Sequence, residues 1–150
     1  MGFGELVCDI LCNMKKRVII FEDNDAAIQK MKLISGMPKY KNEFDFELIE
    51  YPEDIEKWIS DNESSLSNVE LFICDHDIHG AKGDSFVRQI RDLGFKGKML
   101  ANSSDYNELL LKAGCDLENP VNKDLKVIRE ILDKSTQENK EKVGELTGIK

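Results

Sequence analysis

Acidic residues follow two apolar runs of this chain, and their type and spacing suit the binding of a divalent cation. The first run leads into Glu22 and Asp23, and the second leads into Asp75 and, two residues later, Asp77. Carboxylates held a few ångströms apart repel each other, and a bound cation relieves that repulsion. Oxygen ligands of this kind suit Mg²⁺, which keeps several waters and commonly binds beside phosphate. The two clusters together predict a magnesium site.

The two apolar runs, 17–21 and 69–74, must position these acids. Both are short and rich in Val, Ile, Leu and Phe, a pattern that predicts strands buried on both faces. In an open α/β sheet, ligands bind in the crevice at the carboxyl ends of the strands. Acids that follow two neighbouring strands are therefore expected to meet in one pocket.

The rest of the chain alternates predicted helices and strands, which indicates a single α/β domain with a parallel sheet and helices on both faces. Its length of 150 residues and hydrophobic content of 41% suffice for one core. Hydrophobic spacing and Asn, Gly and Pro positions set the boundaries. Helices are predicted near 25–35, 53–59, 84–93, 109–113 and 125–132; further strands near 44–49, 98–102 and 116–118; and a polar loop at 60–68.

The ends of the chain are expected to lie outside this domain. Residues 1–15 are predicted to be an N-terminal extension, 16–133 the domain, and 134–150 a polar tail in which Gly144 and Gly148 interrupt any long helix. The apolar part of the extension is too short to span a bilayer. A net charge of -8 argues against partners such as nucleic acid or an anionic membrane.

The four cysteines lack the paired CxxC spacing of a zinc site, and Cys74 falls inside a predicted buried strand. Together with Cys115 it is expected to be a reduced thiol of a cytoplasmic protein. Cys8 and Cys12 are four residues apart, so a shared metal or a disulfide remains an alternative for them.

In their order and spacing, these motifs resemble the phosphoacceptor receiver domains of two-component response regulators. Residues 18–25 are similar to the receiver's first strand with its acidic pair, and 75–83 to its phosphoacceptor loop, with a glycine at the eighth position after the acceptor. Residues 99–104 resemble the fourth strand and its hydroxyl residue, and 113–116 the small residues before the fifth strand. The resemblance covers 16–133 and implies a CheY-like, doubly wound (βα)5 flavodoxin-like fold with strand order 2-1-3-4-5.

The chemistry that this resemblance implies is phosphoryl transfer to Asp75 from a sensor histidine kinase or a phosphotransfer protein. Ser103, with Ser104 as the alternative, would donate a hydrogen bond to a phosphoryl oxygen and start the conformational switch. As a stand-alone receiver, the chain would signal through a downstream output protein and would not be a turnover enzyme. Its docking face would be the fourth helix, fifth strand and fifth helix.

The magnesium ligands are also implied by the resemblance. Asp23, Asp75 and the backbone carbonyl of Asp77 would hold Mg²⁺, with Glu22 binding through water. The neighbouring histidines, His76 and His79, raise the alternative of zinc, against which stands the simpler expectation that both are exposed at the pocket rim.

One departure from the receiver pattern concerns charge. Receivers usually carry a lysine before the proline that follows the fifth strand, whereas here Asn119 precedes Pro120. An amide can donate a hydrogen bond but brings no charge to a phosphoryl group. Lys82 or Lys123 could supply part of that charge, although Lys123 is expected to face solvent.

Two alternatives remain open. The shortened fifth strand and Asn119 favour a degenerate pseudo-receiver that acts only as an interaction module, while the retained acids argue against it. The pair Asp75 and Asp77 also resembles the DxD signature of haloacid-dehalogenase-like phosphatases, but His79 stands where that family has Thr or Val. Tyr106 follows the fourth predicted strand and belongs to the partner-binding face or to an ordinary half-buried surface.

Overall fold

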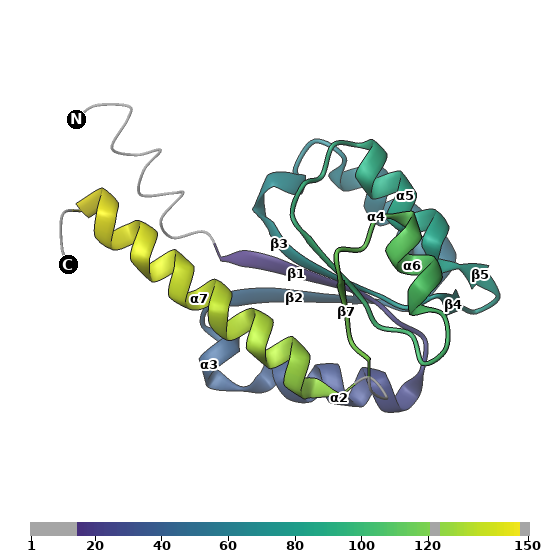
Figure 1. The fold of residues 1–150 in the computed structure, drawn as a ribbon, viewed down its shortest axis with the longest axis horizontal. Helices are drawn as coiled ribbons and strands as arrows, with labels where there is room; N and C mark the ends of the chain where they lie inside the picture. The colour runs from purple at the N-terminus through teal and green to yellow at the C-terminus, as the bar shows by residue number, and fades with distance from the viewer. Residues whose placement is uncertain (1–14, 121–123, 148–150) are drawn as a thin grey trace.

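The computed structural model describes residues 15–120 and 124–147. Five parallel strands form one sheet in the order β2-β1-β3-β6-β7, with helices on both faces (Figure 1). The predicted doubly wound α/β fold is confirmed. The predicted strand order 2-1-3-4-5 is confirmed as well, because β6 and β7 are the fourth and fifth strands of this sheet along the chain. The strands of the sheet are β1 (Lys16–Phe21), β2 (Phe44–Ile49), β3 (Val69–Cys74), β6 (Lys98–Ala101) and β7 (Leu117–Glu118).

The central strands β1 and β3 are buried on both faces because helices cover both. Ile19 and Phe21 face one hydrophobic layer together with Trp58, while Val18 and Ile20 face the other. Helices α2 (Asp25–Gly36), α3 (Pro38–Lys41) and α7 (Leu125–Thr147) cover the second layer, and α4 (Pro52–Asn62), α5 (Gly83–Asp92) and α6 (Asn107–Ala113) cover the first (Figure 1). These two layers hold the strand ends in place.

Local signals set several helix ends. Asn24 caps α2 by accepting a hydrogen bond from the amide of Ala27 at 3.0 Å. Pro52 stands in the first turn of α4. Backbone N–H groups in this turn have no intrahelical acceptor, so the absence of an N–H in proline costs no hydrogen bond. Gly114 ends α6 with a φ of 139°, a left-handed value that favours glycine.

Helix α7 is longer than predicted. It runs to Thr147, and Gly144 lies inside it, so the expectation that this glycine interrupts a long helix is wrong. Tertiary contacts explain the difference: Ser135 is fully buried and its hydroxyl donates to Glu70 on β3 at 2.5 Å. Lys98 on β6 lies 3.6 Å from Glu70 and 3.8 Å from Glu138. The sheet thus anchors the start of the segment predicted to be a tail.

Three smaller elements were not predicted. Part of the predicted loop 60–68 is helical, since α4 continues to Asn62 and a 3₁₀ turn, η1 (Leu66–Asn68), precedes β3. A short hairpin follows β3, formed by β4 (Asp77–Ile78) and β5 (Ala81–Lys82), and α3 follows α2. The predictions made for Cys8, Cys12, Lys123 and the N-terminal segment 1–14 lie outside the described residues. Within the described residues, none of the helices is long and apolar enough to cross a membrane.

Candidate functional site

Four polar residues form a row across the carboxyl edge of the sheet. Each is the first residue after its strand, and each donates its backbone N–H to the last carbonyl of the neighbouring strand. These bonds extend the parallel register by one residue and pair each member of the row with the next. The row, called the strand-end row below, is Glu22 (N–H to Ile49, 3.3 Å), Asp75 (to Phe21, 3.0 Å), Asn102 (to Cys74, 2.8 Å) and Asn119 (to Ala101, 2.9 Å).

The acidic part of the row forms a tight cluster. Carboxylate oxygens of Glu22, Asp23 and Asp75 all lie within 4.8 Å of one another. Glu22 and Asp75 are 1% and 6% exposed, so their charges are largely removed from water. Backbone amides help to hold the groups: those of Asp23 and Asn24 donate to Glu22 Oε2 at 3.2 and 3.3 Å, and that of His76 donates to Asp75 Oδ1 at 2.8 Å.

This donor set fits a hard divalent cation. Three carboxylates each offer an oxygen, and their mutual repulsion in a poorly solvated position is relieved by a positive ion. Glu22, Asp23 and Asp75 are thus brought together as predicted, and the edge at which they meet is the one where α/β sheets bind ligands.

The loop after Asp75 packs tightly against the site. Gly83 begins α5, and its N–H donates to the carbonyl of His76. A Cβ at this position would lie 1.8 Å from the carbonyl oxygen of Asp75, so only glycine allows α5 to start this close to the strand end. The spacing between Asp75 and Gly83 noted in the sequence therefore has a steric reason.

The hairpin turn reaches over the acidic cluster. The backbone N–H of His79 donates to Asp23 Oδ2 at 2.8 Å, and its ring Nε2 lies 3.1 Å from Glu50 Oε2. The same ring stacks on Tyr51 with centroids 4.8 Å apart. By contrast, the exposed carboxylate of Asp77 accepts the N–H of Gly80 at 3.2 Å and does not belong to the cluster. The second acid of the DxD pair therefore lies outside the cluster that holds Asp75.

His76 was expected to be exposed at the pocket rim, and this prediction is wrong. His76 is 3% exposed because its ring packs against Tyr106, at 4.8 Å between centroids, and its Nε2 lies 3.6 Å from Asp84 Oδ1. His79 is the more exposed of the two. Because the rings face different carboxylates, the structure does not bring the two histidines together as a zinc site would require.

The other end of the row is built from amides. The side chain of Asn119 donates to Asn102 Oδ1 at 3.1 Å and to the carbonyl of Asp124 at 2.7 Å. Both asparagines are almost fully buried, at 1% and 2% exposed. Among the described residues, Asn102 Nδ2 and Asn119 Oδ1 have no hydrogen-bond partner.

The predicted switch serine lies just beyond this amide pair. Ser103 is buried, and its Oγ accepts the backbone N–H groups of Asp105 and Tyr106 at 3.4 and 3.2 Å. The hydroxyl thus stabilises the turn before α6, and its contact with a phosphoryl group stays a prediction. Ser104 is exposed.

Sequence reasoning missed Asn102. The predicted strand ended at this residue, whereas β6 ends at Ala101, so Asn102 takes the position after the strand that Asp75 takes on β3. The signal that could have found it is this equivalence: a polar residue directly after an apolar run of a parallel sheet.

Two buried thiols lie beneath the row. Cys74, the last residue of β3, and Cys115, which precedes β7, are both free cysteines packed in the same hydrophobic layer. A hydrogen bond with Cys115 and burial raise the pKa of Cys74 well above its ordinary value. This thiol is therefore protonated and unreactive at neutral pH.

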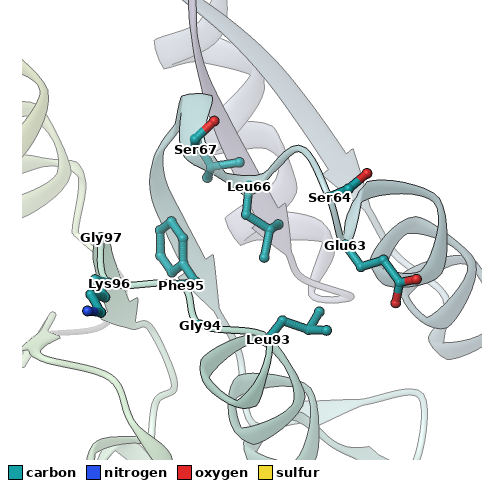
Figure 2. A pocket seen from close by; sticks show the side chains of 10 residues that line it. Glu63, Ser64, Leu66, Ser67, Leu93, Gly94, Phe95, Lys96 and Gly97 are labelled. Atoms are coloured by element: carbon teal, nitrogen blue, oxygen red, sulfur yellow. The ribbon is translucent and has the colours of Figure 1, made fainter.

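A separate hollow lies at the opposite edge of the sheet, near the amino end of β3. Figure 2 shows it between the segment that leads into β3 and the loop that follows α5, with the side chains of Leu66, Leu93 and Phe95 around it. Its lining includes one acid, Glu63, and none of the residues of the strand-end row. This hollow therefore shares no residue with the candidate site.

No protein-family model matches the sequence, and no curated protein matches it either. Solved structures do resemble it. A CheY-like response regulator receiver domain from Methanospirillum hungatei JF-1 has a TM-score of 0.57 and 21% identity, with 83% of this chain and 99% of that chain covered. The N-terminal domain of an uncharacterized protein from Wolinella succinogenes has a TM-score of 0.64 and 19% identity, covering 86% and 99%.

A third similar structure was solved with ligands. The receiver domain of the histidine kinase CKI1 from Arabidopsis thaliana, complexed with Mg²⁺ and BeF₃⁻, has a TM-score of 0.56 and 20% identity, covering 77% of this chain and 89% of that chain. At these identities the likeness concerns the fold. This chain has the fold of CheY-like receiver domains, as the resemblance in its sequence implied.

Proposed function

We propose that this chain is a receiver domain that accepts a phosphoryl group on Asp75 in a Mg²⁺-dependent reaction. The observation that carries the proposal is the cluster of Glu22, Asp23 and Asp75 at the carboxyl edge of a receiver-type sheet, with their oxygens within 4.8 Å of one another. A buried carboxylate beside two others is energetically costly because like charges repel. A bound cation would relieve this repulsion and would leave a carboxylate that can accept a phosphoryl group.

The reaction is a phosphoryl transfer between two side chains. A carboxylate oxygen of Asp75 attacks the phosphorus of a phosphohistidine; a P–O bond forms, the P–N bond breaks, and the electron pair stays on the imidazole, which takes up a proton. A backbone contact helps to fix the nucleophile, since the N–H of His76 donates to Asp75 Oδ1. The chain's own task is to hold that carboxylate in place.

The metal would be held by carboxylates of Asp23 and Asp75, by the backbone carbonyl of Asp77, and through water by Glu22. Bound there, Mg²⁺ would neutralise the charge on the phosphoryl oxygens. Support comes from the carboxylate cluster itself, and from the similar receiver domain that was solved with Mg²⁺ and BeF₃⁻.

The partners belong to the same proposal. A sensor histidine kinase or a phosphotransfer protein would supply the phosphoryl group, and an output protein would bind the phosphorylated domain in the cytoplasm. The domain would therefore act as a switch that is modified once per signal and not as a turnover enzyme.

One observation favours a second candidate, a pseudo-receiver that only binds partners. Asn119 stands where receivers usually have lysine, and both of its N–H groups are already used, one by Asn102 and one by Asp124. A phosphoryl group could gain a bond from Asn119 only if one of these were broken.

Measuring intact mass after incubation with a small-molecule phosphodonor, with and without Mg²⁺, decides between the two. We expect one added phosphoryl group that requires Mg²⁺ and is absent in Asp75→Asn. The matched control is Asp77→Asn, which changes an exposed carboxylate two residues away and should still be modified. Native, Mg²⁺-saturated protein without any adduct would instead establish the pseudo-receiver.

A further inference from the structure

We propose that Asn102 donates the hydrogen bond that a phosphoryl group on Asp75 receives from the β6 side of the site, and that Asn119 orients its amide. The inference rests on the proposed function and adds to it the residue that contacts the phosphoryl oxygen. It assigns this contact to a carboxamide instead of a serine hydroxyl.

The first argument is position. The N–H of Asn102 donates to the carbonyl of Cys74, which in a parallel ladder makes Asn102 the register partner of Asp75. Register partners on adjacent strands lie about 5 Å apart and project to the same face of the sheet. β3 and β6 are such neighbours in the sheet. Asn102, the first residue after β6, is therefore placed directly beside the acceptor.

The second argument is orientation. Asn119 must direct its Nδ2 toward the carbonyl of Asp124, because a carbonyl can only accept. The second hydrogen of that Nδ2 then meets Asn102, which must present its oxygen. The Nδ2 of Asn102 is left as a donor aimed away from Asn119, and so the hydrogen bonds themselves fix which end of each amide is which.

The third argument is the unmet donor. Asn102 is 1% exposed, yet its Nδ2 has no hydrogen-bond partner among the described residues. Leaving a buried donor unsatisfied is costly, and an anionic oxygen is the acceptor that would relieve that cost best. A phosphoryl oxygen attached to Asp75, the register partner, is such an acceptor. The ligand class is therefore a tetrahedral oxyanion bonded to that carboxylate.

Ser103 is less suited to this role. Its Oγ already accepts two backbone N–H groups of the turn that leads into α6, and its own N–H donates to Asn107 Oδ1 at 2.7 Å. Moving the hydroxyl toward the acceptor would break that turn. Asn102, by contrast, can bond an incoming group without giving up a contact.

Two variants of the same shape test the donor directly. Asn102→Thr replaces the amide with a hydroxyl donor, whereas Asn102→Val has the same outline and no donor. With a small-molecule phosphodonor and Mg²⁺, we expect Asn102→Val to form the adduct about tenfold more slowly than Asn102→Thr, because a hydrogen bond to a charged group is worth that much in rate.

The role of Asn119 is tested by rescue. Asn119→Ala should slow adduct formation as Asn102→Val does, since the Asn102 amide loses the contact that orients it. Combining it with Asn102→Thr should restore the rate, because a hydroxyl rotates to its acceptor and needs no such orientation. A purely structural role of Asn119 would leave the double variant as slow as the single one.

The outcomes separate this inference from the function on which it rests. If the unmodified protein takes up no phosphoryl group, the proposed function fails and this inference fails with it. If it is modified and Asn102→Val reacts as fast as Asn102→Thr, the contact assigned to Asn102 is overturned while the receiver function stands. Thermal unfolding of each variant, measured in parallel, identifies any that reacts slowly because it is unfolded.

Discussion

The strand-end row has an acid half on β1 and β3 and an amide half on β6 and β7. The acid half holds Glu22 and Asp75, with Asp23 beside them, and so gathers negative charge within 4.8 Å. The amide half holds Asn102 and Asn119, which carry no charge and bond to each other at 3.1 Å. The acid half thus requires positive charge to relieve it, whereas the amide half is uncharged and leaves Asn102 Nδ2 and Asn119 Oδ1 without partners among the described residues.

This difference between the two halves indicates which group would supply positive charge to a phosphoryl group on Asp75. A phosphoryl group on Asp75 would add negative charge to the acid half, and the amide half offers it only neutral donors. An asparagine amide can donate to a phosphoryl oxygen but brings no positive charge, so it does not replace a lysine ammonium. We infer that the site depends on its metal more heavily than it would with a cation on β7.

The largest expected effect comes from metal binding to the acid half. Mg²⁺ at a hundredfold excess over its Kd should raise the free energy of unfolding by about 2.7 kcal/mol, because the ion binds the folded chain alone. Asp23→Asn should abolish most of this gain. In the absence of Mg²⁺ the same variant should be more stable than the unmodified protein, since one of three repelling charges is gone. Urea unfolding with Mg²⁺ or with a chelator measures both.

Asp77→Asn is the matched control for this experiment. Its carboxylate accepts the Gly80 amide at 3.2 Å and is not part of the cluster, and an amide oxygen can accept that bond equally well. The variant should keep the full gain from Mg²⁺. If Asp77→Asn lost as much of the Mg²⁺-dependent gain in stability as Asp23→Asn, the assignment of Asp23 but not of the Asp77 side chain to the metal site would be wrong.

The acid half was easier to predict from the sequence than the amide half. Apolar runs that end abruptly in Glu22 and Asp75 mark strand ends without any knowledge of the fold, and the structure places both as expected. On β6 the run ends in Ala101, and the polar Asn102 was assigned to the strand. Ser103, to which the phosphoryl contact was assigned, is the next residue along the chain. Only the ladder bond from Asn102 to Cys74 fixes the register.

The length of α7 shows the same limit. Local composition after Asp133 is polar and contains Gly144, which argues against a helix. The contacts that stabilise the helix join residues far apart in the chain, such as Ser135 with Glu70 and Glu138 with Lys98. Such pairings follow from the fold, so no local pattern could reveal them.

A smaller effect is expected when charge is added to the amide half. Asn119→Lys replaces the amide with an ammonium group on a longer side chain, which has three donors and brings a positive charge to the β7 side of the site. We expect adduct formation to rise about fivefold, which corresponds to roughly 1 kcal/mol for a charge-assisted bond. The rate is read from intact mass over time with a small phosphodonor.

The control for added charge is Ser104→Lys, at an exposed position two residues beyond Asn102. General attraction of an anionic donor would raise its rate as much as that of Asn119→Lys. A specific contact from β7 would raise only the latter. If neither variant differs from the unmodified protein, the amide half does not face the phosphoryl group.

The smallest expected effect concerns the thiols that connect the two halves. Cys74 ends β3 and Cys115 precedes β7, and their hydrogen bond, together with burial, raises the pKa of Cys74 well above the ordinary 9.0. The folded state therefore keeps a proton that the unfolded chain loses, and stability falls as pH rises past 9.0. At pH 9.0 the unfolded thiol is half ionised, which lowers the free energy of unfolding by about 0.4 kcal/mol relative to pH 7.

Urea unfolding at the two pH values measures this effect. Cys74→Ala should lack the loss of stability at pH 9.0. Cys115→Ala should show a smaller loss than the unmodified protein, because burial still raises the pKa of Cys74 after its partner is removed. If the free energy of unfolding of the unmodified protein, Cys74→Ala and Cys115→Ala depended on pH in the same way, the predicted effect of the buried Cys74 thiol and its Cys115 partner would be wrong.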